Sequence, residues 1–197
     1  VPFPQPLPIH VPLWVYDIQG IKLHFISVHL YTAAILSTRA LSFKYTFQNP
    51  ILTKRVLAEN HFFFTVDAIL GQGNNAGVQF RSQRIPNSHE MIGYQCDIGG
   101  WSKGTIWGFL YDESRRRKML AEAPQDELKK HVKPKGEWNK LVVRAEGPRI
   151  QIWLNGYQTV DFTEADKDIP LKGRLGLQIH GGLPLECHYR NLRLKTL

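Results

Sequence analysis

The chain has 197 residues, of which 43% are hydrophobic, 21% charged and 11% aromatic. This length fits one ordinary domain with a sizeable core, and the composition excludes an intrinsically disordered chain. The formal net charge is +8, and the longest basic run, residues 115–118, follows Asp112 and Glu113. Such a run is typical of a solvated loop or a helix start. No zinc-finger or RNP-like spacing accompanies it, so we do not expect nucleic acid as a partner.

Residues 1–40 do not show the pattern of a sheet. The prolines near the start are Pro2, Pro4, Pro6, Pro8 and Pro12. Each removes a backbone donor and fixes φ, which predicts an extended arm or a disordered tail over residues 1–14, followed by an unassigned segment up to residue 40. The apolar stretch 21–36 is interrupted by charged and histidine side chains and is shorter than the about 20 residues that a membrane span needs. We therefore expect no membrane span.

From His61 onward the chain consists of short apolar or alternating runs separated by turn residues. These runs predict strands over 61–70, 76–82, 93–98, 140–146, 148–154, 157–162, 174–180 and 186–194. Asn155 and Gly156 form a strong hairpin signal, because both tolerate positive φ. Residues 114–132 contain helix formers broken by Pro124, so one short helix or a long loop is expected there. The fold class is all-β, an antiparallel sandwich or barrel of residues 41–197.

Polar side chains alternate with apolar ones along three of these strands. The polar pairs are Gln79 with Arg81, Gln95 with Asp97, and Gln178 with His180. Period-2 alternation places them on faces opposite the core, and their amide, carboxylate, guanidinium and imidazole groups can all hydrogen-bond sugar hydroxyls. The alternative is an ordinary solvated sheet face, which usually carries Lys, Glu and Thr. The pattern favours a carbohydrate site.

His180 lies at a strand end before Gly181 and Gly182, where a ligand can approach the backbone closely. Its ordinary pKa of about 6.5 suits proton transfer, and a structural histidine is the alternative. Further acid–base candidates on loops are His89, Glu90, Tyr111, Asp112 and Glu113. Surface charge is the alternative for each, and we prefer it for Glu113. Trp101, Trp107 and Trp138 can stack on a sugar ring or pack in the core.

The metal and cysteine signals are weak. Cys96 and Cys187 are the only cysteines, and the sequence leaves their pairing open, although two buried thiols are favoured. His180, Glu186 and His188 match no metal-ligand motif. The sequence makes no cofactor certain and leaves a divalent metal open. The GxSxG, P-loop, GxGxxG and HExxH signatures do not occur, nor does the E-x-D-x-E run of sandwich glucanases.

A set of motifs, in order along the chain, carries a family resemblance. The motifs are NAGVQFRS (75–82), HEMIGYQCD (89–97), YDESR (111–115), GEWN (136–139), IWLNG (152–156), VDFT (160–163) and GLQIHGG (176–182). Over residues 49–197 they closely resemble the 3-keto-disaccharide hydrolase domain family. The resemblance implies a concanavalin A-like jelly-roll sandwich and activity on glycosides oxidised at C3 of the sugar.

A keto group at C3 acidifies the C2 proton, so a base can remove it, the group at C1 leaves by elimination, and water then adds. By motif position Arg81, Gln95, Asp97 and His180 correspond to site residues. We assign catalytic roles to His180, as base or acid, to Arg81, as stabiliser of negative charge, and to Asp97. The substrate-binding set is Gln79, Gln95, Gln178, Glu90, Tyr111 and Trp107.

The sequence departs from the family pattern in two places. Many members carry an acidic residue where Gln95 stands, and members usually begin with a strand and a Trp–Gly-rich hairpin that residues 1–40 lack. One alternative function is a non-catalytic, lectin-like carbohydrate-binding module, and another is a scaffold that binds a partner through the proline-rich arm. The expected ligand is a carbohydrate and the expected location periplasmic or extracellular.

Overall fold

The structure is a computed structural model of the chain, and it describes residues 30–31, 35–36, 41–45, 51–58, 60–71, 75–88, 90–102, 104–180 and 185–197. The predicted proline-rich arm, most of the unassigned segment, His89 and the Gly181–Gly182 pair lie outside these residues. Within residues 1–40, the structure describes two short strands that pair antiparallel, β1 (Leu30–Tyr31) and β2 (Ile35–Leu36).

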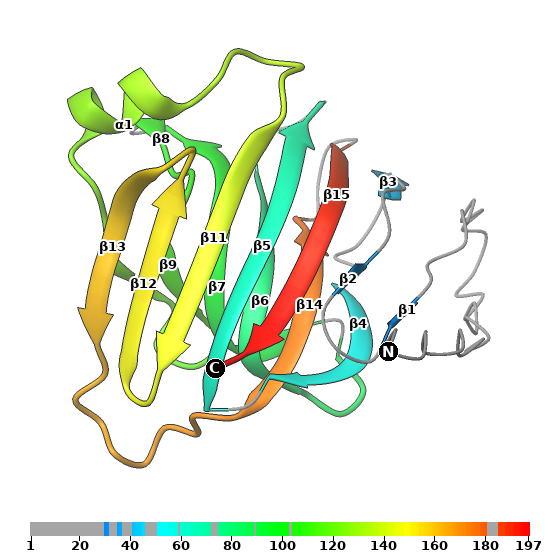
Figure 1. The fold of residues 1–197 in the computed structure, drawn as a ribbon, viewed down its shortest axis with the longest axis vertical. Helices are drawn as coiled ribbons and strands as arrows, with labels where there is room; N and C mark the ends of the chain where they lie inside the picture. Colours follow the sequence, from blue (N-terminus) through cyan, green and yellow to red (C-terminus); the bar gives the residue numbers. More distant parts are fainter. Residues whose placement is uncertain are drawn as a thin grey trace, which may run out of the picture.

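Two antiparallel sheets pack face to face (Figure 1). The first sheet has the order β10-β9-β7-β6-β14-β4, with β8 paired to β7 beside this path. Its strands are β4 (Ile51–Ala58), β6 (Asn75–Arg84), β7 (Met91–Trp101), β8 (Gly104–Thr105), β9 (Leu110–Glu113), β10 (Lys118–Ala121) and β14 (Gly173–Ile179).

The second sheet has the order β13-β12-β11-β5-β15-β3. Its strands are β3 (Leu41–Tyr45), β5 (His61–Leu70), β11 (Asn139–Glu146), β12 (Arg149–Leu154), β13 (Tyr157–Thr163) and β15 (Leu185–Thr196). Every strand predicted from His61 onward is present, with ends shifted by a few residues at most. The predicted all-β antiparallel sandwich is therefore confirmed.

The core lies between the sheets. In β5, Phe62 and Phe64 are buried and alternate with half-buried residues. In the first sheet Val78 and Phe80 are buried opposite them, and the rings of Phe62 and Phe80 meet edge to face with centroids 6.2 Å apart. Burying an apolar side chain of this size contributes about 1.5–3 kcal/mol to the stability of the fold. The face of each strand that carries the apolar residues of the period-2 pattern therefore turns toward the core.

The hairpin between β12 and β13 confirms the prediction for Asn155 and Gly156. Their φ angles are 49° and 93°, the left-handed values that a tight hairpin needs. Asn155 also has a second function, since its Oδ1 accepts a 2.8 Å bond from the backbone N–H of Lys140 and its Nδ2 donates to the carbonyl of His131 at 2.7 Å. The turn residue thus fixes the neighbouring loop.

The short helix predicted within residues 114–132 is present, in the second half of this range. Residues 118–121, which are good helix formers, make strand β10, and Lys118 pairs with Asp112 of β9. The chain reverses at a turn in which Ser114 and Arg117 have φ angles of 57° and 50°, and the N–H of Arg117 donates to the Asp112 carbonyl at 2.9 Å. Pairing with β9 therefore outweighs the weak local helix propensity.

The short helix α1 (Gln125–His131) begins directly after Pro124. Acidic residues lie in its first turn and basic residues in its last, which complements the helix dipole. Leu128 is fully buried and attaches the helix to the sandwich. No helix in the described part of the chain is long and apolar enough to cross a membrane.

The basic run at residues 115–118 is only partly the solvated loop that was predicted. Arg115 and Arg116 both form ion pairs with Asp112, whose side chain is fully buried. Arg116 also bonds Glu164 at 2.7 Å, and the guanidinium of Arg115 lies 4.7 Å from the ring centroid of Tyr94. The buried carboxylates hold these two arginines against the sandwich, because an uncompensated charge there would be costly.

Cys96 of β7 and Cys187 of β15 are buried, unpaired thiols, as the sequence favoured. Burial raises the pKa of Cys96 well above its ordinary value and that of Cys187 to about 12. Both groups therefore stay protonated and behave as small apolar side chains of the core.

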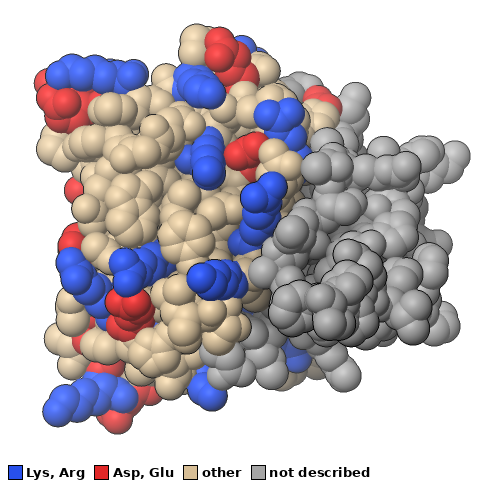
Figure 2. All heavy atoms as spheres, viewed as in Figure 1, with Lys and Arg blue, Asp and Glu red and all other residues tan. Residues whose placement is uncertain are grey.

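On the face drawn in Figure 2, which is the outer face of the second sheet, basic side chains stand singly or beside acidic ones. Among the described residues, three arginine–carboxylate ion pairs lie in this sheet: Arg144 with Glu146 at 2.6 Å, Arg149 with Asp161 at 2.6 Å, and Arg190 with Asp67 at 3.3 Å. The positive charge on this face is thus dispersed and partly neutralised.

Candidate functional site

The outward face of the first sheet carries a row of polar residues. Directly opposed residues on neighbouring strands project to the same side of a sheet. Gln79 of β6 opposes Gln95 of β7, which in turn opposes Tyr111 of β9. Two residues further along these strands, Gly77 of β6 opposes Asp97 of β7 on one side and Gln178 of β14 on the other. We call the face formed by Gln79, Gln95, Asp97, Tyr111, Glu113 and Gln178 the polar face.

A chain of hydrogen bonds runs across the polar face. The Ser82 hydroxyl donates to Oε1 of Gln79 at 2.8 Å, Nε2 of Gln79 donates to Oε1 of Gln95 at 2.6 Å, and Nε2 of Gln95 donates to Oδ1 of Asp97 at 2.7 Å. Gly77 makes this arrangement feasible, because a Cβ there would lie only 2.6 Å from Cδ of Gln95. The amide of Gln95 therefore lies flat over the Gly77 backbone.

Asp97 is the most perturbed carboxyl of the polar face. It is 1% exposed, and burial raises its pKa to about 8, assisted by the charge of Glu113 and opposed by the hydrogen bond from Gln95. Its Oδ2 has no hydrogen-bond partner among the described residues. A carboxyl with this pKa exchanges a proton near neutral pH, which is the property required of an acid–base group.

Two further carboxylates lie near this group. Burial and the charge of Glu90 raise the pKa of Glu113, while hydrogen bonds from Ser114 and the charge of His180 lower it. Glu90 is half-buried and accepts a 2.6 Å bond from the Ser114 hydroxyl. The preferred interpretation of Glu113 as plain surface charge is therefore wrong: β9 places it on the polar face, partly removed from water.

His180 lies at the end of β14, as the sequence predicted. Its backbone N–H donates to the Asn75 carbonyl at 3.2 Å, and its side chain is exposed. Because its charge lowers the pKa of Glu113, the imidazole is within electrostatic reach of that carboxylate. The structure thus brings His180 to the same face as Asp97, Glu113 and Gln178.

Gln178 and Tyr111 complete the face. Gln178 is 4% exposed, and its Oε1 has no hydrogen-bond partner in the described part of the chain. The hydroxyl of Tyr189 fixes the strand beneath by donating to the Gln178 carbonyl at 3.0 Å. Burial and the charges of Glu113 and Asp97 raise the pKa of Tyr111. Its phenol therefore remains a hydrogen-bond donor.

Arg81 does not lie where alternation predicted. The β6–β7 register shifts between Phe80 and Gln83, and Arg81 adopts a φ of 49°. Its guanidinium is turned inward, where it lies 5.9 Å from the Phe62 ring centroid and donates to the Asn60 carbonyl at 2.6 Å. Ser82 takes its place beside Gln79. The bulge exchanges the sides of the two residues, so the prediction that Arg81 shares the face of Gln79 is wrong.

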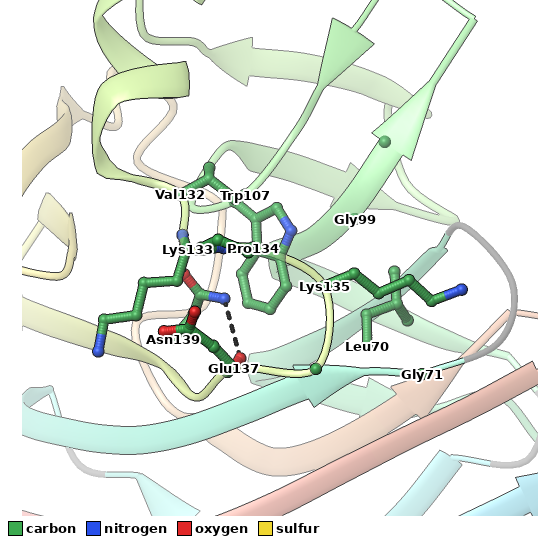
Figure 3. Close-up of a pocket in the computed structure, with 12 residues that line it drawn as sticks. Leu70, Gly71, Gly99, Trp107, Val132, Lys133, Pro134, Lys135, Glu137 and Asn139 are labelled. Carbon is green, nitrogen blue, oxygen red and sulfur yellow. Dashed lines mark hydrogen bonds between the residues drawn. The ribbon is translucent and has the colours of Figure 1, made fainter.

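Trp107 is 6% exposed and belongs to the core, and it also lines a hollow of about 300 Å³ at one end of the sandwich. Figure 3 shows its indole ring in this hollow, between Lys133 and Lys135 of the loop after α1. Asn139 fixes that loop by accepting a 2.9 Å bond from the Lys133 N–H. Trp107 therefore lies apart from the row of Gln79, Gln95 and Tyr111, although Gly99 of β7 borders the same hollow.

Among the described residues, no three His, Cys, Asp or Glu side chains converge as metal ligands would. Of the three ligands considered from the sequence, Glu186 and His188 lie 2.8 Å apart in β15, whereas His180 directly follows the last residue of β14. The described side chains therefore do not form a set that fits a divalent metal.

Sequence reasoning ranked Glu113 and Trp101 too low. Trp101 lies an even number of residues after Gln95 and Asp97 in β7, on the same face of the strand. Its ring meets that of Tyr111 edge to face, with the ring centroids 6.1 Å apart. The extension of the alternation in β7 by a few residues would have placed Trp101 on the polar face. No sequence signal indicates that Glu113 and Glu90, which come from separate segments, lie together.

Comparisons with known proteins bear on the family and the fold of this chain. A family described as 3-keto-alpha-glucoside-1,2-lyase-like domain matches residues 49–195. A "putative glycosyl hydrolase" from Parabacteroides distasonis is 17% identical, with a TM-score of 0.57 over 79% of this chain and 80% of its own. The carbohydrate binding module CBM66 from Bacillus subtilis is 14% identical, with a TM-score of 0.58 over 78% and 86%.

A Bacillus subtilis protein with a galectin-like fold is 11% identical, with a TM-score of 0.61 over 81% of this chain and 82% of its own. At such identities these structures establish the shared fold, and the predicted jelly-roll sandwich is confirmed. No curated protein matches the chain.

Proposed function

The chain belongs to the 3-keto-alpha-glucoside-1,2-lyase-like domain family, and from this premise we propose that it cleaves 3-keto-glycosides on the polar face by proton abstraction at C2. A carbohydrate-related role follows from the family itself. The finer assignment rests on the polar face, where a buried carboxyl, Asp97, ends a chain of amides beside Tyr111 and His180. These groups match the needs of an elimination better than those of a direct displacement.

The proposed reaction has two stages. A base takes the proton from C2, and the electrons of the C–H bond form an enolate with the C3 carbonyl oxygen. The enolate then expels the glycosidic oxygen from C1, which leaves as an alcohol after it receives a proton, and a C1=C2 double bond remains. Addition of water across this double bond, with OH at C1 and H at C2, gives the free 3-keto sugar.

Asp97 is the proposed base. Its buried Oδ2 has no partner among the described residues and is the atom proposed to accept the C2 proton, while the Gln95 amide holds Oδ1 in place. A pKa of about 8 makes the carboxylate a stronger base than an ordinary aspartate, and enough of it is ionised near neutral pH. The family motif indicated only that Asp97 is catalytic, and the present proposal makes it the base.

In this scheme Tyr111 donates a hydrogen bond to one substrate oxygen and His180 gives a proton to another. The Tyr111 hydroxyl stays protonated because its pKa is raised, so it can donate a hydrogen bond to the enolate oxygen that Arg81 was expected to stabilise. Arg81 faces inward and takes no part. His180 is exposed at the end of β14 and is the proposed proton donor to the leaving oxygen.

The test follows a 3-keto-glucoside in D₂O, with NMR recording both deuterium at C2 and release of the aglycone. The wild type should do both, and Asp97→Asn should lower both by about 10²–10⁴-fold, the usual contribution of a general base. Asp126→Asn, which removes an exposed carboxylate from α1, is the matched control and should change neither. A wild type that binds the unoxidised glycan but exchanges no C2 proton would establish the lectin-like alternative instead.

A further inference from the structure

A second hollow, of about 290 Å³, lies at the β9–β10 edge of the polar face. Met119 of β10, which lines it, directly opposes Tyr111. Trp101, which also lines it, has its ring 6.1 Å from that of Tyr111. The row from Gln79 through Gln95 to Tyr111 therefore leads directly into this hollow, which we call the edge pocket.

The edge pocket has apolar walls and a polar rim. Trp101, Phe109 and Met119 supply the walls, and Glu122 and Gln125 supply carboxylate and amide groups. Small-molecule sites combine such walls with a few polar groups, and their volumes begin at about 300 Å³. The edge pocket therefore has a size and composition suited to one small polar ring with an apolar face, such as a pyranose.

Trp101 is unusual among the large apolar side chains of the described residues. It is 45% exposed, and the other comparably exposed one, Leu197, ends the chain. The Tyr111 ring stands at 88° to the indole and supports it from the side. Exposure of a large aromatic side chain next to a row of hydrogen-bonding groups is typical of a binding surface, because the ring can stack while polar neighbours bond hydroxyls.

The part of the pocket formed by β8 and α1 is fixed in position. Nε2 of Gln125 donates to the Thr105 carbonyl at 2.8 Å, and the Thr105 N–H donates to Oε1 of Gln125 at 3.1 Å. The Thr105 hydroxyl donates to the Gly99 carbonyl at 3.1 Å. These bonds join α1, β8 and β7, so the pocket exists before a ligand arrives and little ordering cost opposes binding.

We propose that the edge pocket is the subsite for the leaving sugar of a 3-keto-disaccharide, with its pyranose ring stacked on Trp101 and a hydroxyl bonded to Glu122. This inference rests on the proposed function and deepens it: the keto sugar lies at Asp97, and the second sugar lies beyond Tyr111. Trp101 is a specificity-determining residue, so its contribution should appear only with substrates whose leaving group is a sugar.

The experiment compares two substrates, a 3-keto-disaccharide and the methyl 3-keto-glucoside. Trp101→Ala should lower kcat/KM for the disaccharide by about 5–10-fold, which corresponds to the usual strength of an aromatic contact. It should leave the methyl glycoside unchanged, and Trp101→Phe should restore most of the loss. Trp153→Ala, which removes an indole from β12 in the second sheet, is the control and should affect neither substrate. Equal losses on both substrates, or no loss on either, would overturn the subsite.

Binding separates failure of the subsite from failure of the proposed function. If the wild type cleaves neither keto substrate, the proposed function is wrong, and calorimetric titration with the unoxidised disaccharide and methyl glucoside then tests the subsite alone. The disaccharide should bind at least about fivefold more tightly to the wild type than to Trp101→Ala, with methyl glucoside unaffected. Equal disaccharide affinity in both proteins, or no binding to the wild type, would refute it.

Discussion

Gln95 donates a 2.7 Å hydrogen bond to Oδ1 of Asp97 from the position two residues before it on the same strand. Side chains at i and i+2 share a face, so the bond fixes the carboxyl parallel to β7 and leaves Oδ2 without a partner among the described residues. Burial nevertheless raises the pKa of Asp97 to about 8, because one hydrogen bond does not replace hydration. Fixed geometry and high basicity thus coincide in one group.

The pH dependence of activity should reflect this carboxyl. If Asp97 is the base, only its ionised form removes the C2 proton, so the rate of deuterium exchange at C2 should rise about tenfold per pH unit below the pKa of about 8 and level off above it. NMR of C2 exchange in the 3-keto-glucoside between pH 5 and 10 measures this step apart from the proton that His180 gives to the leaving oxygen. A profile that is already flat from pH 5 to 8 would contradict the assignment of Asp97 as base.

The same carboxyl should lower stability as the pH rises. Its pKa is about 8 in the folded protein and 3.8 as the ordinary value, so the folded state binds more protons between these limits and the free energy of unfolding falls with rising pH there. Asp97→Asn cannot ionise and should be more stable than the wild type by more than about 1 kcal/mol at pH 8.5. At pH 4 the two proteins should unfold alike in urea, and an equal difference at both pH values would show another cause.

Gln95→Glu tests the departure from the acidic residue common in the family. The substitution removes the N–H donor and adds a second carboxyl at the position that bonds Asp97. Two adjacent carboxyls cannot both ionise easily, so the pair should titrate at a higher pH and the activity profile should move by at least about one pH unit to the alkaline side. Gln83→Glu, at an exposed position of β6, is the control and should leave the profile in place.

Alternation along the strands was sufficient to predict most of the fold. Strands β5, β7 and β11 follow the period-2 pattern because each has one face in the core, and Asn155 with Gly156 identifies the hairpin. Strand β10 could not be predicted in this way. Its residues favour a helix locally, and only the hydrogen-bond partners offered by β9 make it extended.

The same reasoning found Gln79, Gln95, Asp97 and Gln178 on one face, because their strands run in regular register there. The alternation placed Arg81 on the wrong face, because a β-bulge reverses the side chain there. The bulge depends on the positive φ of Arg81, which the presence of an arginine in the sequence does not indicate. The proximity of Glu90 and Glu113 depends on the path of the chain between β6 and β10, and no local pattern encodes that path.

Arg81→Met tests whether Arg81 has the catalytic role expected from the sequence or, as its inward position indicates, none. Arg81 is 2% exposed, the Nε and Nη1 of its guanidinium have no partner among the described residues, and burial lowers its pKa to about 10. An apolar side chain of similar length should therefore be tolerated, with a change in unfolding free energy within about 1–2 kcal/mol. The value of kcat/KM on the 3-keto-glucoside should change less than about threefold, whereas a charge-stabilising catalytic arginine would cost about 10²-fold or more.

Glu164→Gln should destabilise the protein in a pH-dependent way. Although burial raises the pKa of Glu164, hydrogen bonds from Arg116 at 2.7 Å and Tyr94 at 2.6 Å lower it to about 2. The carboxylate therefore stabilises the fold fully above its ordinary pKa of 4.5, and this contribution is lost as the pH falls from 4.5 through about 2. At pH 7 the substitution should cost about 2–4 kcal/mol, because it removes one of the two carboxylates that pair with Arg116 and the charged acceptor of the Tyr94 hydroxyl.

Urea denaturation at pH 7 and pH 2.5 measures both parts of this prediction. The difference between the wild type and Glu164→Gln should be large at pH 7 and should shrink markedly at pH 2.5, where the wild-type carboxyl is itself partly protonated. Glu146→Gln breaks the exposed pair with Arg144, whose side chains are both 42% exposed, and should cost less than about 1 kcal/mol at either pH. If the two variants behaved alike, the bonds of Arg116 and Tyr94 to Glu164 would not hold the β9–β10 turn against the sandwich.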